Sequence, residues 1–197
     1  MITDTVTEQV VLLSESGEPV GVTAKATVHH LDTPLHLAFS CYLFNGAGQL
    51  LLTQRAASKA TWPGVWTNSC CGHPAPGESL SEAVRRRLAD ELGIAAVDVT
   101  LALPAFRYRA VMTNGLVENE MCPVFRAHTD ADPNPFPGEV DGFEWVDWST
   151  LVDKVIAGER AVSPWALDQI TQLAAFPADP REWPVGDPDD LPPAARA

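Results

Sequence analysis

Apolar runs separated by turn residues predict short strands in the first third of the chain. Residues 9–13 form the first run, 37–44 a longer one and 49–54 a third. Asn45 and Gly46 lie between the last two runs, and such turn residues between apolar runs are typical of β-hairpins. We therefore predict an isolated strand followed by a hairpin.

The clearest helix pattern covers residues 79–93. An apolar position recurs every four residues along it, which makes one stripe on a helix surface: Leu80, Val84, Leu88 and Leu92. Ser79 and Glu82 match a capping box at its start, and Gly93 is a typical helix stop. Both ends of this helix are therefore written in the sequence.

The rest of the chain mixes the two kinds of element. The pattern predicts further strands at 105–111, 116–127 and 142–147, and helices at 149–157 and 163–175. Because ~100–200 residues usually form one domain, we expect a single α/β or α+β domain.

The last 21 residues, 177–197, differ from the rest in composition. They contain six prolines and several acidic residues. Such a segment cannot bury enough apolar area to offset the entropy lost when it becomes ordered. We expect one domain at 1–176 and a disordered or draped, acidic, proline-rich tail.

The net charge of the chain excludes fewer functions than its total suggests. The 197 residues include 13 basic and 26 acidic side chains, a formal net charge of −13. General nucleic-acid binders and proteins held on anionic membranes need basic surface, so both classes are excluded. However, the acid excess lies at the two ends, and residues 25–109 hold eight bases against six acids. This central stretch can still bind an anion.

The sequence gives no targeting signal and no disulfide framework. No stretch approaches the ~18 apolar residues of a membrane span, and the N-terminus lacks a signal-peptide pattern. The four cysteines include the adjacent pair Cys70 and Cys71, which suits a disulfide framework poorly. We expect reduced thiols in a cytoplasmic protein.

A motif starting at Gly72 resembles the Nudix box. The box has Gly, five residues, Glu (here Glu78), seven residues, and then Arg-Glu-apolar-any-Glu-Glu-any-Gly-apolar. Arg87 and Asp90 stand where the box has glutamates that bind the Mg²⁺ of a hydrolase. Arg87 and Glu91 lie four apart on one helix face. They either place a metal carboxylate beside a phosphate-binding guanidinium, or form a plain surface ion pair.

Three histidines and two glutamates form a second candidate group: His29, His36, His73, Glu118 and Glu120. The glutamates are two apart in a predicted strand, so both point to one face. Imidazole and carboxylate ligands suit a divalent transition metal or Mg²⁺. A lone histidine is usually a satisfied polar residue, and a Glu-x-Glu pair is usually solvated. The joint pattern, rather than any one residue, indicates a metal site.

The joint pattern resembles type 1 isopentenyl-diphosphate delta-isomerase, a Nudix-fold family that does not hydrolyse its substrate. The resemblance runs from about residue 10 to residue 175. The segments that carry it most clearly are Lys25-x₃-His29-x₆-His36, Leu37-Ala38-Phe39-Ser40, Arg55-Ala56-x-Ser58-Lys59, Trp62 to Pro74, Phe106 to Arg109, Val117 to Phe125, and Ser163-Pro164-Trp165. It implies an α/β (α+β) Nudix fold, in which a mixed β-sheet lies between helices, with an extra N-terminal strand and C-terminal helices.

The resemblance also implies a reaction. The family converts isopentenyl diphosphate to dimethylallyl diphosphate through a tertiary carbocation. Cys71 and Glu120 would lie on opposite faces of the carbon skeleton, with Tyr108 hydrogen-bonded to Glu120 and Trp165 against the cation. The sequence does not settle which side delivers the first proton. We favour the Glu120–Tyr108 side, because a thiol with a pKa of ~8.5 is a weak acid toward an alkene.

Two metal sites and one diphosphate site follow from the same resemblance. The His₃Glu₂ group would hold Mn²⁺, Zn²⁺ or Mg²⁺, while Glu91 and the Cys71 carbonyl would hold a Mg²⁺ on the diphosphate. The diphosphate itself would contact Lys25, Arg55, Lys59 and Arg87. The partner is then a small prenyl diphosphate, with no nucleic acid and no membrane, and the protein is a monomer or a homodimer.

Two other functions compete with the isomerase. A Nudix diphosphohydrolase shares the fold and Mg²⁺, but Arg87 in the box and the histidines outside it argue against hydrolysis. A catalytically silent binding module with a structural metal would not need Cys71, Tyr108 and Trp165 together.

Overall fold

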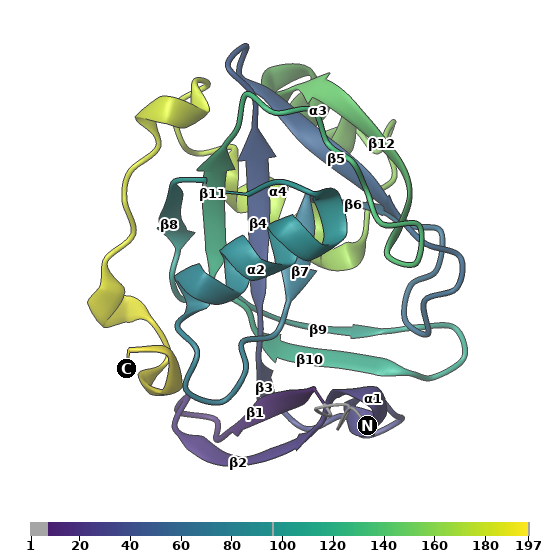
Figure 1. The fold of residues 1–197 in the computed structure, drawn as a ribbon, viewed down its shortest axis with the longest axis vertical. Coiled ribbons are helices and arrows are strands. Elements are labelled where there is room, and N and C mark those ends of the chain that lie inside the picture. Colours follow the sequence, from purple (N-terminus) through teal and green to yellow (C-terminus); the bar gives the residue numbers. More distant parts are fainter. Residues whose placement is uncertain (1–7, 96, 197) are drawn as a thin grey trace, which may run out of the picture.

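Two β-sheets organise the chain in the computed structural model, which describes residues 8–95 and 97–196 (Figure 1). The larger sheet runs in the spatial order β12 (Val140–Asp147), β5 (Gln49–Arg55), β4 (Phe39–Phe44), β11 (Val124–His128) and β8 (Val99–Leu103). Two short strands join it, namely β6 (Trp66–Thr67) beside β5 and β7 (Cys70–Gly72) beside β4. The smaller sheet runs in the order β2 (Pro19–Ala24), β1 (Gln9–Leu13), β3 (His36–Leu37), β10 (Val117–Met121) and β9 (Arg107–Val111).

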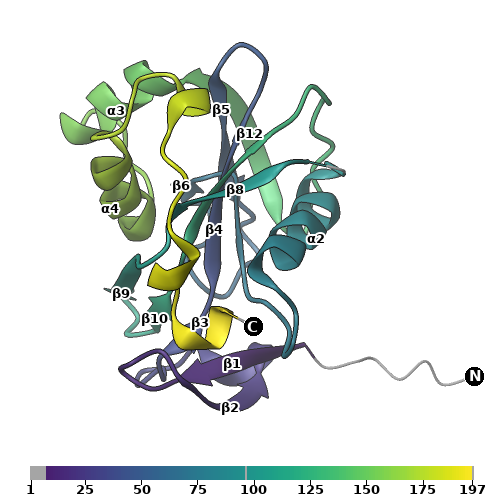
Figure 2. The same ribbon diagram turned by 90° about the vertical axis from the view of Figure 1, so that its left-hand side faces the viewer.

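Helices cover both faces of the larger sheet. Figure 2 shows α2 (Leu80–Leu92) on one side and α3 (Trp148–Ile156) and α4 (Pro164–Leu173) on the other. A further short helix, α1 (Lys25–Val28), follows β2. The sheet is mixed, because β4 is parallel to β11 and antiparallel to β5 and β7. The expected sheet between helices is therefore confirmed.

The central strand β4 explains why residues 37–44 are apolar apart from Ser40. Alternate side chains point to opposite faces of a strand. Cys41 and Leu43 belong to the apolar cluster that includes α2, whereas Tyr42 and Phe44 belong to the cluster that includes α3 and α4. A strand buried on both faces has no polar side, so apolar residues replace the usual alternation.

The capped helix forms as predicted. The Ser79 hydroxyl accepts a hydrogen bond from the Glu82 N–H, and the Glu82 carboxylate accepts one from the Ser79 N–H. Gly93 ends the helix at a φ of 67°, the left-handed region that glycine enters without a steric penalty. The buried face of α2 includes Arg87 and Glu91 as well as the predicted apolar stripe.

Strand pairing differs from the sequence prediction in two places. The predicted hairpin pairs only at Phe44 and Leu50, because the rest of β4 pairs with β7 and β11. The predicted strand 116–127 is two strands, β10 and β11, which lie in different sheets. Pro123 lies between them and cannot donate to a strand ladder, so the chain changes sheets there. The patterns also missed strands β2, β6, β7 and β8.

The segment after Phe176 packs against the domain instead of being disordered. It forms the 3₁₀ turns η1 (Pro180–Glu182), η2 (Pro188–Asp190) and η3 (Pro193–Ala195). Trp183 is only 2% exposed, so the expectation that this segment buries too little apolar area was wrong. Over residues 177–196, the chain follows the other expectation, that of a tail draped over the domain. Among the described helices, none has the length and apolar character needed to cross a bilayer.

Candidate active site

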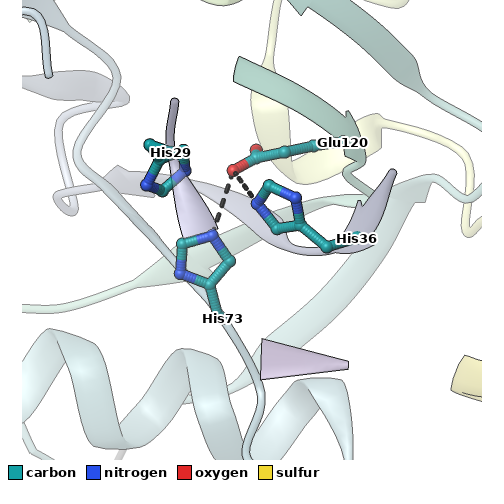
Figure 3. A group of neighbouring side chains, drawn as sticks. All are labelled: His29, His36, His73 and Glu120. Atoms are coloured by element: carbon teal, nitrogen blue, oxygen red, sulfur yellow. Dashed lines mark hydrogen bonds and ion pairs between the residues drawn. The ribbon is translucent and has the colours of Figure 1, made fainter. Parts of the chain in front are cut away.

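Three histidines and one glutamate meet where the two sheets adjoin. Figure 3 shows the rings of His29, His36 and His73 gathered around the Glu120 carboxylate. One ligand atom from each of these four residues lies within 4.8 Å of the others. His29 ends α1, His36 is in β3, His73 follows β7 and Glu120 is in β10. Strands β3 and β10 pair in parallel with His36 opposite Glu120, so backbone register fixes two of the four.

The hydrogen bonds of His36 leave a nitrogen that suits a cation. Its Nδ1 donates to the Pro34 carbonyl oxygen at 2.9 Å, which leaves Nε2 as the acceptor nitrogen of a neutral ring. Nε2 lies 3.3 Å from Glu120 Oε1 and makes no hydrogen bond. An imidazole lone pair facing a carboxylate oxygen needs a proton or a metal ion between them.

Glu118 completes the predicted set from the edge of this cluster. Its Oε2 lies 2.8 Å from His29 Nε2, which is also buried and makes no hydrogen bond. Nitrogen and oxygen donors of this kind fit a divalent metal ion. All five residues predicted as ligands are therefore neighbours, with His29, His36, His73 and Glu120 forming the tightest group.

Charge in the cluster is concentrated on Glu120. Burial alone would raise the pKa of Glu120, but its contacts with His36 and His73 hold that pKa well below its ordinary value. Burial also opposes protonation of His36, yet the Glu120 carboxylate beside it raises the pKa of His36 overall. The carboxylate stays ionised and the cluster retains a negative charge to attract a cation.

A cavity adjoins this cluster and collects the other predicted site residues. Its wall includes the four predicted catalytic side chains, Cys71, Tyr108, Glu120 and Trp165. It also includes the four predicted diphosphate contacts and the predicted Mg²⁺ ligand: Lys25, Arg55, Lys59, Arg87 and Glu91. Among the predicted ligands, His29, His73 and Glu118 reach the same wall, whereas His36 is fully buried behind it.

Two aromatic rings and a hydroxyl lie in the part of the cavity next to Glu120. The Tyr108 hydroxyl donates to Glu120 Oε2 at 2.8 Å. Burial and then the nearby Glu120 charge raise the pKa of Tyr108 well above its ordinary value, so the phenol stays protonated. The Tyr108 and Trp165 ring centroids lie 5.6 Å apart, and the Arg55 guanidinium carbon lies 5.8 Å from the Trp165 ring centroid. The Trp165 face is thus placed to attract positive charge.

Two cationic side chains of the cavity, Arg87 and Lys59, belong to one network of ion pairs. Arg87 Nε donates to Glu91 Oε1 at 2.8 Å, and these side chains are only 8% and 10% exposed. The surface ion-pair alternative for Arg87 and Glu91 is therefore wrong. The Glu139 carboxylate forms an ion pair with Lys59, and its Oε2 lies 3.4 Å from Arg87 Nη2. Glu139 is a cavity residue that no sequence pattern indicated, because it lies in the loop before β12.

Glycine at the start of the altered box is required by this network. A Cβ on Gly72 would lie 2.9 Å from Arg87 Cγ and 3.1 Å from a ring carbon of Phe39. The first contact would force Arg87 to shift and the second would press on the Phe39 ring, so Gly72 lets α2 bring Arg87 against β7. Glu78 of the box instead binds Arg86 and the Ala75 N–H, which closes the loop that carries His73.

The Cys71 thiol lies between two polar groups that the sequence analysis did not assign. Its Sγ is 3.2 Å from Asn68 Oδ1 and 3.3 Å from Ser40 Oγ. Burial raises the pKa of Cys71 to about 11, although both hydrogen bonds oppose this. Ser40 and Asn68 fall within the resembling segments, and Gln169 lies one helical turn after Trp165. That spacing places Gln169 on the same face of α4 and could have indicated it.

The comparisons with known proteins agree with this geometry. Residues 34–166 match the NUDIX domain. An isopentenyl-diphosphate Delta-isomerase of Saccharopolyspora erythraea is 64% identical over 188 residues, which is 95% of this chain and 97% of that protein. A protein of the same name from Rhizobium rhizogenes is 53% identical over 96% of this chain and 91% of its own length.

Solved structures give the same fold. The protein DR0079 from Deinococcus radiodurans has a TM-score of 0.64 and 25% identity, covering 84% of this chain and 98% of that chain. A MutT protein from Methanosarcina mazei has a TM-score of 0.57 over 72% of this chain and 94% of its own, at an identity that supports only the fold. Domain match, full-length relatives and fold agree, and the chain belongs to the NUDIX-domain family and, within it, to the isopentenyl-diphosphate Delta-isomerases.

Proposed function

We propose that the protein interconverts isopentenyl diphosphate and dimethylallyl diphosphate by proton addition and removal through a tertiary carbocation. The observation that carries this proposal is that one cavity brings together two groups of side chains. The first group is Cys71, Glu120, Tyr108 and Trp165, and the second is four cationic side chains. The names of the relatives support the same substrate. Its class, an intramolecular shift of a carbon–carbon double bond, needs both an acid and a base but no activated water.

The alkene end is served by Glu120 and Tyr108 on one side and Cys71 on the other. Protonation of an unactivated alkene needs a strong local acid, and the Tyr108 hydroxyl already donates to Glu120. We assign delivery of the first proton to this pair. Cys71 takes part on the opposite face, and Trp165 stabilises the cation without offering an atom that would bond to it.

The diphosphate end is served by Lys25, Arg55, Lys59 and Arg87. One guanidinium group can donate two parallel hydrogen bonds to phosphate oxygens, and this paired contact fixes the orientation of the substrate. Glu91 and the Cys71 backbone carbonyl are suited to hold Mg²⁺ on the diphosphate, because this ion commonly combines one or two carboxylates with phosphate oxygens.

The His₃Glu₂ cluster is suited to Mn²⁺, Zn²⁺ or Mg²⁺ held by His29, His36, His73, Glu118 and Glu120. The bare Nε2 atoms of His29 and His36 support this assignment. When bound, such an ion supplies positive charge that orients the Glu120 carboxylate. With four free cysteines, we further propose a cytoplasmic enzyme that works as a monomer or homodimer on a small soluble substrate.

An isotope experiment tests the reaction. Purified protein is incubated with isopentenyl diphosphate, Mg²⁺ and Mn²⁺ in D₂O, and the products are followed by NMR and a phosphate assay. The expected result is deuterium in a methyl group of dimethylallyl diphosphate and no released phosphate. Release of phosphate without isomerisation would show a Nudix diphosphohydrolase instead and overturn the proposal.

Two substitutions test the assignment of catalytic residues. We expect Cys71→Ala and Glu120→Gln each to lower kcat by roughly 10³-fold or more, because each removes a group that acts on the reacting carbons. The neighbouring Cys70→Ala is the matched control, since Cys70 lies in the apolar cluster under α2. Circular dichroism checks that all three remain folded. Near-full activity of Cys71→Ala with loss in Cys70→Ala would reverse the assignment.

A further inference from the structure

A line of polar side chains crosses the apolar layer between β4 and α4 and ends at Cys71. Tyr42, Ser40 and Gln169 are each fully buried. The Tyr42 hydroxyl lies 3.1 Å from Gln169 Oε1, and Gln169 Nε2 lies 2.9 Å from Ser40 Oγ. Ser40 Oγ lies 3.3 Å from Cys71 Sγ. The roles assigned above use Cys71 but not the other three residues.

The direction of these hydrogen bonds follows from Asn68. Asn68 Nδ2 donates to the backbone carbonyls of Cys41 and Cys70, so its Oδ1 must face the other way. That oxygen accepts from the Thr67 hydroxyl at 2.9 Å and from Trp165 Nε1–H at 3.1 Å, and the Cys71 thiol, 3.2 Å away, donates to it as well. The single thiol proton of Cys71 is therefore committed to Asn68.

The rest of the line is then determined. Because the thiol proton points to Asn68, the Ser40 hydroxyl is the donor of the hydrogen bond between Ser40 and Cys71 Sγ. Ser40 Oγ is consequently free to accept, and it accepts from the Gln169 amide. Gln169 in turn presents its oxygen to the Tyr42 hydroxyl. Every donor from Tyr42 through Gln169 to Ser40 therefore points toward Cys71.

We propose that Ser40 and Gln169 are positioning residues for the Cys71 thiol. A thiol forms weak hydrogen bonds and would rotate freely in an apolar wall, whereas contacts from Asn68 and Ser40 on two sides hold the sulfur in one place. Ser40 alone cannot do this, because its hydroxyl also lies 3.4 Å from Cys122 Sγ and could turn to it. The Gln169 amide occupies the Ser40 oxygen and keeps that hydroxyl directed at Cys71.

This inference rests on the proposed function, in which Cys71 faces the substrate carbons. Neither Ser40 nor Gln169 lines the cavity, so they act on substrate only through Cys71. Misplacement of a reacting group by about 1 Å can cost ~100-fold in rate. We therefore expect Ser40→Ala and Gln169→Leu to lower kcat by roughly 10–100-fold while KM for isopentenyl diphosphate changes less than about twofold.

A matched control separates positioning from stability. Ser69 is as buried as Ser40, and its hydroxyl bonds only backbone groups, namely the Leu51 carbonyl and the Leu43 N–H. Ser69→Ala should lower Tm as Ser40→Ala does but leave kcat near that of the wild-type protein. Equal losses of kcat in Ser40→Ala and Ser69→Ala would overturn the proposal, as would a rise in KM at constant kcat.

A double variant gives the second test and covers the case in which Gln169→Leu fails to fold. Tyr42→Phe combined with Gln169→Leu replaces both partners of a buried hydrogen bond by apolar groups, which leaves no unpaired tyrosine hydroxyl. We expect this variant to recover Tm relative to Gln169→Leu while kcat stays low. Recovery of both Tm and kcat would show a purely structural role and overturn the proposal. Wild-type protein that fails to isomerise would instead overturn the proposed function, so the two failures are distinguishable.

Discussion

The surroundings of Cys71 favour the neutral thiol over the thiolate. Its side chain lies in a cavity wall with Trp165 nearby, and burial raises its pKa to about 11. The same wall keeps Tyr108 protonated, whereas Glu120 stays ionised.

Alkylation kinetics should show this protonation state. The thiolate is the reactive form, and a raised pKa means that less of it exists at pH 8 than for a free cysteine. In EDTA-treated protein, we expect the rate of iodoacetamide labelling at Cys71 to rise steadily from pH 7 to pH 10.5 without a plateau. Intact mass spectrometry measures the rate, with Cys71→Ala as the blank. A plateau below pH 8.5 would contradict the assignment.

At this scale the sequence predicted the reactive groups but not what holds them. Cys71, Glu120 and the histidines belong to motifs whose spacing is local, so a resemblance carries them over residue by residue. Ser40 and Gln169 are 129 positions apart and meet only because α4 packs on β4. Single-sequence patterns contain no information about such pairs.

At the scale of elements, the metal cluster joins parts of the chain that otherwise touch little. His29 ends α1 and His36 is in β3, both in the N-terminal part of the smaller sheet. His73 follows β7 of the larger sheet, beneath α2. A bound ion would therefore tie the smaller sheet to the loop that leads into α2 and would restrain Lys25 at the first residue of α1.

Metal removal should consequently lower stability as well as activity. A ligand that binds only the folded state at 100 times its Kd adds about 2.7 kcal/mol, or about 5–10 °C in Tm for a chain of this size. We expect that rise when Mn²⁺ is added back to EDTA-treated protein, measured by differential scanning calorimetry. His29→Ala should abolish the response. His30→Ala is its control, since the His30 ring bonds the Asp32 N–H outside the cluster. Equal responses in the two variants would contradict the site.

Elements with local signals were predicted well, and elements defined by distant partners were not. The caps of α2 are set by Ser79, Glu82 and Gly93 within one helix, so sequence alone located them. Strands β10 and β11 look like one strand because only Cys122 and Pro123 separate them. Their separation depends on β10 pairing with β3 and β11 pairing with β4, contacts that no local pattern encodes.

At the scale of the whole molecule, the C-terminal segment connects the two ends of the fold. Figure 2 shows it running from the α3–α4 layer past β8 to the N-terminal hairpin of β1 and β2. Along the way the Gly186 N–H donates to the Leu101 carbonyl on β8, and the Ala194 N–H donates to the Gly17 carbonyl in the β1–β2 turn. The segment thus covers an edge strand and holds the hairpin that precedes α1.

Trp183 anchors this strap, defined as residues 177–196. Its ring lies against Phe44, Trp148 and Phe176, with centroids 5.2 to 5.9 Å apart, and its Nε1–H donates to the Pro177 carbonyl at 3.0 Å. Three ring contacts and a satisfied indole make it a core residue, although the surrounding sequence is rich in proline and acid. Trp183 thus supplies apolar area to one cluster, while Leu191, Ala194 and Ala195 of the strap pack against the other.

Removal of the anchor should destabilise the domain rather than only release the strap. Truncation of a buried Trp to Ala costs about 3–5 kcal/mol, because it removes apolar contact and leaves a cavity. We expect Trp183→Ala to lower the free energy of unfolding by this amount in urea, with an unchanged m-value. Val185→Ala is the control, since Val185 is 70% exposed two residues away and should cost less than about 0.5 kcal/mol. If the strap folded separately from the domain, Trp183→Ala would leave the main unfolding transition at its wild-type position. The strap would then contribute nothing to the stability of the domain. A shift of that transition would instead make the strap part of the same cooperative unit as β4 and α3, so that the acidic end of the chain contributes to the stability of the site without contacting it.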